Sequence, residues 1–379
     1  MFEAMIASLA FVAFTYVIYP LAMLLRARWL PRPVRPIEPH RWPTVTCVVA
    51  SHDEGERLVD KVRALLSTDY PPGLLEVVVA DDGSSDGSPS RARALDPARV
   101  RVASNPKQAG KPSALVRAVA IARGDVLLLC DARQRLAPGA VRALVAPMAD
   151  PGVGAVTGHL RLDAARGPGA YWTYETAIRR AEGRTGSVVG ATGAIYAVRR
   201  ELFPRTLPAD TILDDVYVPM TLIRGGFRVA YAEDAIAYDL ELDVSREFVR
   251  KVRTLAGNFQ LLAMLPWLAS PLRNPVFWRY FWHKIARLLC PAALAIALVT
   301  SFEAHGLLAN ALFAAQLYLY SLAAFGHVRA SRAGRAATLC CTFVALNLAA
   351  VMGFVTWVRR ANRVTWVQTS TLGGGSATH

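Results

Sequence analysis

Residues 75–88 read LEVVVADDGSSDGS, an apolar run that ends in three aspartates and two glycines. A short valine-rich run bounded by turn residues is typical of a strand buried on both faces. Four further segments are also apolar and strand-like: residues 44–51, 99–105, 125–131 and 153–162. Helix-like segments lie near residues 55–67, 86–95, 110–123 and 138–149. This alternation predicts an α/β fold with a mainly parallel sheet covered by helices on both faces.

Carboxylates stand where two of these strands end. Asp81 and Asp82 follow one apolar run, and Asp131 follows another in LLLCDARQ. Such residues also serve as turn residues or helix caps, but adjacent acids repel unless a donor or a positive charge lies between them. Ligands of parallel sheets gather beyond the carboxyl ends of the strands. We therefore expect Asp81 or Asp82 to bind a nucleotide base or ribose, and Asp131 to bind a cation that bridges a diphosphate.

A second acid pair lies in DTILDDVYVPM, where Asp214 and Asp215 stand among apolar residues. Burial of two neighbouring acids raises the pKa of one, which produces a general base near neutral pH. The alternative is an N-cap of the following helix. Lys111, at a predicted helix start, is either a phosphate ligand or an ordinary exposed lysine.

Residues 245–260, SREFVRKVRTLAGNFQ, predict a helix with Arg250 and Arg253 on one face and an apolar stripe opposite. The basic face is either solvated, in contact with lipid, or placed to stabilise the charge that develops on a departing diphosphate.

The composition points to a membrane protein. Hydrophobic residues make up 53% of the chain, charged residues 19%, and the mean hydropathy is +0.28. Three or four stretches are long enough to span a bilayer: residues 4–25, 285–302, 307–326 and 336–358. The net charge of +14 is scattered or lies beside these stretches, which favours contact with anionic lipid headgroups and an anionic substrate over nucleic acid. The five cysteines show no zinc or disulfide spacing.

The arginines that follow the first stretch place the N-terminus outside and the next part of the chain in the cytoplasm. If all four stretches cross, Arg359 falls outside, so the side of the C-terminus stays open. The predicted organisation is a transmembrane helix at 1–28, a proline-rich linker at 29–43, a cytoplasmic catalytic domain at 44–243, interface helices at 244–283, a transmembrane region at 284–363 and a tail at 364–379.

Taken together, residues 44–260 resemble the membrane-embedded family-2 glycosyltransferases, which include cellulose, hyaluronan and chitin-type synthases and bacterial exopolysaccharide enzymes. The resemblance rests on DDGS at residues 81–84, the acid of an Asp-x-Asp-like motif at Asp131, a TED-like triplet at residues 213–215, and an Arg-x-x-Arg element at residues 250–253. It implies a GT-A-type domain that moves a hexose, of glucose or N-acetylglucosamine type, from a UDP-sugar to a polysaccharide or lipid-linked acceptor.

The resemblance also implies roles for single residues. Asp81 or Asp82 would hold uridine, Asp131 would serve the nucleotide and Mg²⁺ or Mn²⁺, and Asp215, beside Asp214, would deprotonate the acceptor for inverting attack. Arg250 and Arg253 would stabilise the leaving UDP, and Gly193 and Thr254 would line the acceptor site. The implied location is the cytoplasmic face of a bacterial inner membrane, with oligomerisation left open.

Two positions depart from the family pattern. Arg133 replaces the last acid of Asp-x-Asp, so the cation loses a ligand or Arg133 supplies part of its charge. Thr254 replaces the aromatic residue after the arginines, which argues against processive synthesis. The alternatives are a lipid glycosyltransferase that adds one sugar, a nucleotide-sugar hydrolase or nucleotidyltransferase, and a non-catalytic nucleotide receptor.

Overall fold

The computed structural model describes residues 1–34, 39, 41–163, 169–240, 244–329 and 334–359, and these form two compact units. The first unit carries a sheet and comprises the described parts of residues 33–165 and 186–240. The second consists of helices, from the described parts of residues 1–32, 166–185 and 241–361. The described part of residues 166–185, predicted as part of the catalytic domain, therefore groups with the apolar helices.

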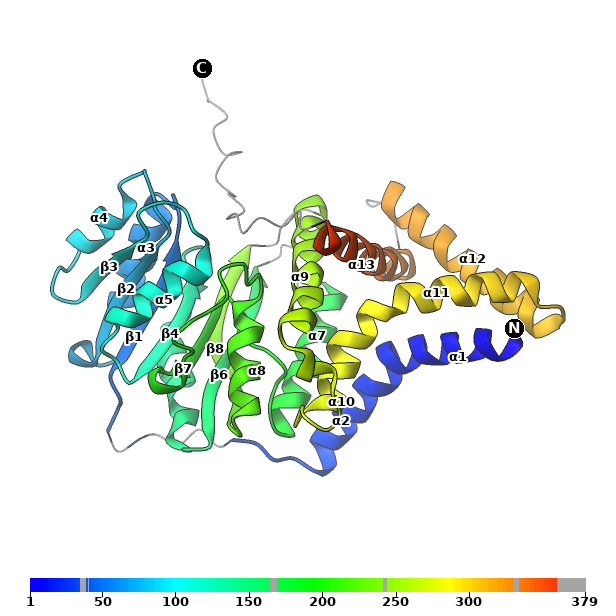
Figure 1. The fold of residues 1–379 in the computed structure, drawn as a ribbon, viewed down its shortest axis with the longest axis horizontal. Helices are drawn as coiled ribbons and strands as arrows, with labels where there is room; N and C mark the ends of the chain where they lie inside the picture. Colours follow the sequence, from blue (N-terminus) through cyan, green and yellow to red (C-terminus); the bar gives the residue numbers. More distant parts are fainter. Residues whose placement is uncertain (35–38, 40, 164–168, 241–243, 330–333, 360–379) are drawn as a thin grey trace, which may run out of the picture. The chain divides into compact units, whose positions relative to one another are not determined.

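The sheet holds the described strands in the order β3-β2-β1-β4-β7-β6-β8-β5 (Figure 1). Their bounds are β1 (Val45–Ser51), β2 (Leu75–Asp81), β3 (Val100–Ser104), β4 (Val126–Asp131), β5 (Arg135–Leu136), β6 (Val153–Asp163), β7 (Ile195–Arg199) and β8 (Arg228–Leu240). β1 pairs in parallel with β2 and β4, and β2 pairs in parallel with β3. β7 runs antiparallel to both β4 and β6. The α/β prediction is confirmed. The sheet is parallel from β3 to β4 and mixed beyond β4.

Four helices of this unit lie between the strands as predicted: α3 (Glu56–Leu66), α4 (Ser88–Ala94), α5 (Lys111–Ile121) and α6 (Ala140–Val145). A further helix, α8 (Asp214–Arg224), lies between β7 and β8 in the chain. Every residue of β1 is buried, because this strand lies inside the sheet and helices cover it. α5 packs against β1, β2 and β3, so its first residue lies at the edge of the sheet where those strands end.

The second unit contains the apolar helices. Their bounds are α1 (Phe2–Ala13), α2 (Tyr19–Trp29), α7 (Ala170–Arg184), α9 (Val244–Met264), α10 (Phe277–Tyr280), α11 (Ala286–Glu303), α12 (Leu307–Val328) and α13 (Arg335–Val358). Four helical stretches among the described residues are long and apolar enough to cross a membrane: Phe2–Trp29, Phe277–Glu303, Leu307–Val328 and Arg335–Val358. They coincide with the four predicted stretches.

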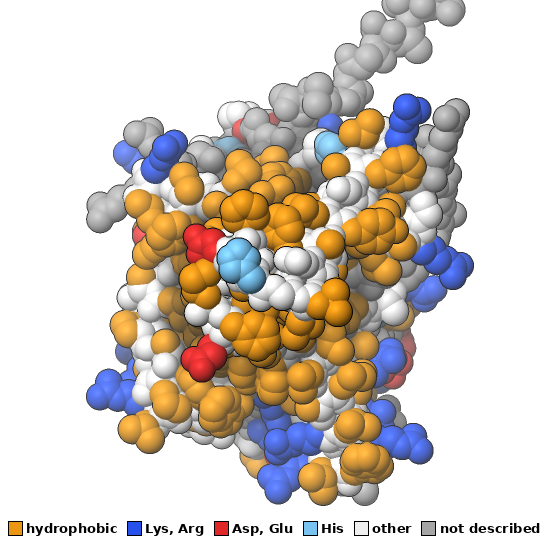
Figure 2. Space-filling view, turned by 90° about the vertical axis from the view of Figure 1, so that its right-hand side faces the viewer, with side chains coloured by type: hydrophobic (Ala, Val, Ile, Leu, Met, Phe, Trp, Pro, Cys, Tyr) orange, Lys and Arg blue, Asp and Glu red, His pale blue; other side chains and the backbone are white. Residues whose placement is uncertain are grey.

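Hydrophobic side chains cover most of the face seen in Figure 2, over the ends of apolar helices. Phe302 and Leu307 are among the exposed apolar residues, at 72% and 89% exposure. Exposure on this scale is unusual for a protein surface in water and is expected for a surface in contact with lipid.

The helix α9 confirms the predicted apolar stripe. Its Phe259 stacks on Trp357 of α13, with ring centroids 5.9 Å apart. A Cβ at Gly353 would lie 2.9 Å from the backbone nitrogen of Ala256, so α9 and α13 cross closely at a position that only glycine allows.

Candidate active site

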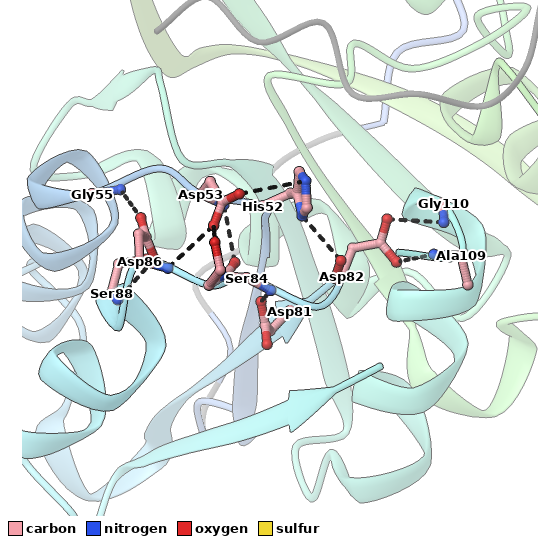
Figure 3. A network of polar contacts seen from close by, with 11 residues as sticks. His52, Asp53, Gly55, Asp81, Asp82, Ser84, Asp86, Ser88, Ala109 and Gly110 are labelled. Carbon is pink, nitrogen blue, oxygen red and sulfur yellow. Dashed lines mark hydrogen bonds and ion pairs between the residues drawn. The ribbon is translucent and has the colours of Figure 1, made fainter. Parts of the chain in front are cut away.

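The turn after β2 folds back on itself through Asp81. This side chain is 3% exposed, and its Oδ1 accepts a hydrogen bond from the backbone nitrogen of Ser84 at 3.0 Å (Figure 3). Gly83 has φ of 75°, and a Cβ there would lie 2.9 Å from the carbonyl carbon of Lys107. Glycine is therefore required where the turn approaches the loop that precedes α5.

The carboxylate of Asp82 accepts hydrogen bonds from other parts of the protein. Asp82 is 0% exposed, and its Oδ1 accepts hydrogen bonds from Asn105 Nδ2 at 2.7 Å and Ala109 N at 2.8 Å. Its Oδ2 accepts one from Gly110 N at 2.8 Å (Figure 3). Because both oxygens face protein donors, Asp82 fixes the loop before α5.

His52 and Asp53, directly after β1, belong to the same network and were not singled out from the sequence. Asp53 has φ of 50°, and its Oδ1 accepts a hydrogen bond from Ser85 N at 2.7 Å. His52 Nδ1 lies 3.0 Å from the carbonyl oxygen of Asp82 (Figure 3). The signal was present, since an acid near the end of an apolar strand is the same pattern that drew attention to the other two strand ends.

Lys111 lies between carboxylates from two other segments. Its Nζ is 3.0 Å from Oδ1 of Asp131, at the end of β4, and 3.5 Å from Oδ1 of Asp214, at the start of α8. Burial opposes the positive charge, but Asp131 and Asp214, followed by Asp215, raise the pKa of Lys111. The ammonium therefore stays charged at neutral pH, and three residues predicted independently meet at one place.

Two polar atoms in this region have no hydrogen-bond partner within the described part of the chain. They are Oδ2 of Asp214 and the hydroxyl of Tyr196, and both are buried. Burial raises the pKa of Tyr196 well above its usual value, and the charges of Asp214, Asp215 and Asp131 raise it further. Tyr196, on β7, therefore faces the same carboxylates, and no sequence signal marked it.

Asp215 approaches the loop that contains Gly193. A Cβ at Gly193 would lie 3.2 Å from Asp215 Oδ2, and Ala191 N donates a hydrogen bond to the carbonyl oxygen of Asp215 at 2.7 Å. Leu213 is the N-cap of α8 and makes no side-chain capping bond, so neither Asp214 nor Asp215 is the cap. Both acids lie in the first helical turn, where the helix dipole favours negative charge.

Arg133 pairs with a buried carboxylate of β8. Its Nη2 and Nε donate to the two oxygens of Asp239 at 2.8 and 3.1 Å, and the Asp239 side chain is 2% exposed. Gln134 Nε2 donates to Asp239 as well, at 3.1 Å. Of the two expectations for Arg133, this geometry favours the loss of a cation ligand, because the guanidinium is already paired.

Arg250, Arg253 and Thr254 lie on α9, in the helical unit. Arg250 Nη2 is 2.6 Å from Oε2 of Glu247, and the guanidinium lies 5.6 Å from the ring centroid of Trp172. The Thr254 hydroxyl donates to the carbonyl oxygen of Arg250 at 2.9 Å. The predicted helix is confirmed, and the roles of these residues on UDP and acceptor stay predictions.

The residues present fit a divalent cation that is shared with a nucleotide. Within the described ranges no group of three or more His, Cys, Asp or Glu side chains could hold a metal ion alone. A nucleotide-bound Mg²⁺ needs only one or two carboxylates, because phosphates and water complete its shell. Asp131 uses Oδ1 for Lys111, and Asp214 has one buried oxygen without a hydrogen bond. These two carboxylates are the candidates.

Comparison with known proteins agrees with this arrangement. Residues 46–207 match the model of the family described as Glycosyl transferase family 2, a range that includes the turn after β2, Lys111, Asp131 and Gly193. These residues form a glycosyl transferase family 2 domain. The family match ends before α8, so Asp214 and Asp215 lie beyond it.

Similar curated proteins carry the name N-acetylglucosaminyltransferase. That of Rhizobium meliloti (strain 1021) is 27% identical over 270 residues, which cover 65% of this chain and 63% of the relative. That of Bradyrhizobium elkanii is 34% identical over 122 residues, 31% of this chain and 66% of the relative. The chain thus spans less than two thirds of the length of these relatives.

A solved structure shares the fold of this chain over nearly its whole length. The mannosyltransferase PcManGT from Pyrobaculum calidifontis, in complex with GDP-Man and Mn²⁺, matches with a TM-score of 0.74. The match covers 95% of this chain and 100% of that one, at 24% identity. It confirms the GT-A-type architecture.

Proposed function

We propose that the protein transfers a hexose from a UDP-sugar to an acceptor, with inversion, at the cytoplasmic face of a bacterial inner membrane. The single observation that carries the proposal is the position of Lys111, whose ammonium lies between Asp131 and Asp214 where separate segments of the sheet-bearing unit converge. A fixed positive charge among carboxylates suits a ligand that brings both phosphates and a metal ion.

The donor is assigned to this end of the sheet. Lys111 would contact the diphosphate, and Asp131, with Asp214 as a second candidate, would share a Mg²⁺ or Mn²⁺ ion with it. The cation, when bound, neutralises the charge of the diphosphate leaving group. The names of the similar relatives favour N-acetylglucosamine as the sugar, with glucose as the next candidate.

Asp215 is the proposed general base. It would accept the proton of the acceptor hydroxyl as that oxygen forms a bond to the anomeric carbon. The bond from the same carbon to the diphosphate oxygen breaks on the opposite face, so the configuration inverts and UDP leaves. The approach of Asp215 to Gly193 supports this assignment, because it leaves space for an acceptor where any larger residue would crowd the carboxylate.

Asp81 and Asp82 receive different roles in this proposal. Asp81 lies in the turn after β2 and remains the candidate for the uridine, whereas Asp82 acts indirectly by holding the loop that ends at Lys111. Asp82 is thus a positioning residue.

Transfer of a single sugar to a lipid-linked acceptor is the second candidate. Thr254 favours it, since its hydroxyl is hydrogen-bonded within its own helix and it offers no aromatic face on which a sugar polymer could stack.

The test is to incubate the purified protein with radiolabelled UDP-sugars, Mg²⁺ or Mn²⁺, and membrane lipid extract, and then to measure product size. We expect UDP release that depends on acceptor, with one donor strongly preferred. The Asp215→Asn variant should bind UDP normally and lose transfer by a factor of about 10³ or more. Full transfer by this variant would refute the assigned base, and UDP release without acceptor would indicate a hydrolase.

A further inference from the structure

A pocket of about 570 Å³ opens between α2 and α7 of the helical unit. Three exposed arginines line it, Arg28 from α2 and Arg180 and Arg184 from α7. Leu24 and Trp29 are among the apolar residues that complete it. The pocket thus combines a basic rim with an apolar wall.

The position of the pocket is defined by the first candidate span. Arg28 and Trp29 are the last two residues of the stretch Phe2–Trp29, and Trp29 is 69% exposed. The last turn of a membrane-spanning helix lies at the depth of the lipid headgroups, where tryptophan and arginine are both favoured. We therefore place the mouth of the pocket in the headgroup region.

The lining of the pocket is basic. None of its lining residues is an aspartate or glutamate, and Arg28 and Arg184 take part in no ion pair within the described part of the chain. Guanidinium groups bind phosphate oxygens through two parallel hydrogen bonds, so Arg28 and Arg184 at one opening favour a phosphate over a neutral ligand.

Hydrogen bonds of residues that do not line the pocket help to hold α2 and α7 together. The Tyr19 hydroxyl of α2 donates to Oε1 of Glu182 on α7 at 2.7 Å, and His283 Nδ1 lies 2.8 Å from the same oxygen. Arg32 N also donates to the carbonyl oxygen of Arg184 at 2.6 Å. Since these contacts are buried or involve the backbone, the arginines are displayed on a fixed frame, which lowers the entropic cost of binding.

We propose that this pocket binds the headgroup phosphate of an anionic phospholipid, with the lipid chains along Leu24 and Trp29. The surface of a cytoplasmic leaflet is rich in such lipids, and each nearby basic residue adds to the attraction. The proposal does not depend on the transfer reaction, because no residue of the candidate active site lines the pocket.

The experiment measures the affinity of the full-length protein, in a neutral detergent, for fluorescent phosphatidylglycerol. Diacylglycerol with the same chains is the probe without phosphate, and inorganic phosphate is the competitor. We expect saturable binding of phosphatidylglycerol, none of diacylglycerol, and no displacement by millimolar phosphate. The double variant Arg28→Gln/Arg184→Gln should weaken binding at least about tenfold, as expected for the loss of two charge-assisted contacts.

The matched control is Arg26→Gln/Arg335→Gln, which removes the same charge from two exposed arginines at helix ends outside the pocket. It should change affinity less than about twofold. A second variant, Ala177→Trp, fills the pocket and keeps its charge, and it should weaken binding as well.

The proposal is overturned by equal losses in both double variants, by equal binding of diacylglycerol, or by displacement with inorganic phosphate, which would indicate a site for free anions. Melting temperature and UDP affinity serve as folding controls for each variant. If the double variant does not fold, Ala177→Trp decides: unchanged phosphatidylglycerol affinity in that variant refutes the site.

Discussion

The carboxylate of Asp82 accepts a hydrogen bond from the backbone nitrogen of Gly110, the residue immediately before Lys111. Asp82, directly after β2, therefore fixes the residue that precedes Lys111 at the start of α5. Of the two aspartates predicted as nucleotide ligands, this one contacts the backbone of the loop before α5.

Replacement of Asp82 by Asn should destabilise the protein by about 2 kcal/mol, because the part-buried backbone donor of Ala109 and the buried donor of Gly110 then face an uncharged amide. Thermal unfolding in detergent measures this loss. The control is Asp60→Asn, whose side chain is 67% exposed and whose effect should be small. Equal melting temperatures for the two variants would contradict the positioning role.

Replacement of Lys111 by Met should lower kcat/KM about 100-fold and weaken UDP binding, because Asp131 and Asp214 lose the charge between them. Titration calorimetry with UDP separates binding from turnover. Lys107→Met is the matched control, since Lys107 is exposed in the same loop, and it should leave both quantities nearly unchanged. Similar losses in both variants would show that kcat/KM and UDP binding depend on the total positive charge of the loop and not on the position of Lys111.

Replacement of Gly193 by Ala should reduce kcat about 10- to 100-fold with little change in UDP affinity. The new Cβ would lie 3.2 Å from Asp215 Oδ2 and would displace the proposed base. Gly139→Ala is the control, because nothing lies within 4 Å of a Cβ there. A loss of UDP affinity as large as the loss of kcat would argue that Gly193 serves the donor instead.

Stability should depend on pH through Lys251. Its Nζ lies 4.4 Å from the ring centroid of Tyr171, and burial lowers the pKa of Lys251 from 10.5 to about 8, against the opposing charge of Glu247. The folded state thus binds this proton less tightly than the unfolded state. The free energy of unfolding should rise with pH between about 8 and 10.5 and lose that contribution below pH 8.

The Lys251→Met variant should remove this rise and melt higher than the unchanged protein at pH 7. Melting temperatures between pH 7 and 10.5 in one detergent provide the measurement, with the exposed Lys107→Met as control. A slope that persists in Lys251→Met would assign the pH dependence to other groups.

The strands that could be predicted are those whose pairing in the sheet follows from their order along the chain. β1, β2, β3 and β4 were expected within one residue at each end, because continuous apolar runs separated by helices leave a parallel arrangement as the usual solution. β7 and β8 were not expected. Their residues pair with strands distant in sequence and in both directions, and apolar periodicity carries no information about direction.

The candidate site divides in the same way. Lys111, Asp131 and Asp214 could be found because each charged residue interrupts an apolar context at the end of an element. Tyr196 could not, since a tyrosine in a buried strand is indistinguishable from an ordinary core residue until its neighbours in space are known. The nucleotide role of Asp82 stays a prediction, because sequence does not show which donors a buried carboxylate will face, and in the structure both of its oxygens accept hydrogen bonds from the protein.

The helix α7 illustrates a further limit. Its sequence carries the acids Glu175 and Glu182 and several arginines. A helix with so many charged residues is not expected beside membrane-spanning helices. Pairing reduces the cost of burying the two glutamates, because one oxygen of each lies at hydrogen-bonding distance from His283.

That pairing has a consequence for biosynthesis. His283 follows Glu182 by 101 residues, so about 5–20 s of synthesis separate the acid from this hydrogen-bonding partner. During that interval the nascent α7 must remain hydrated or be held by another factor, and insertion of the later helices becomes the event that allows it to dock.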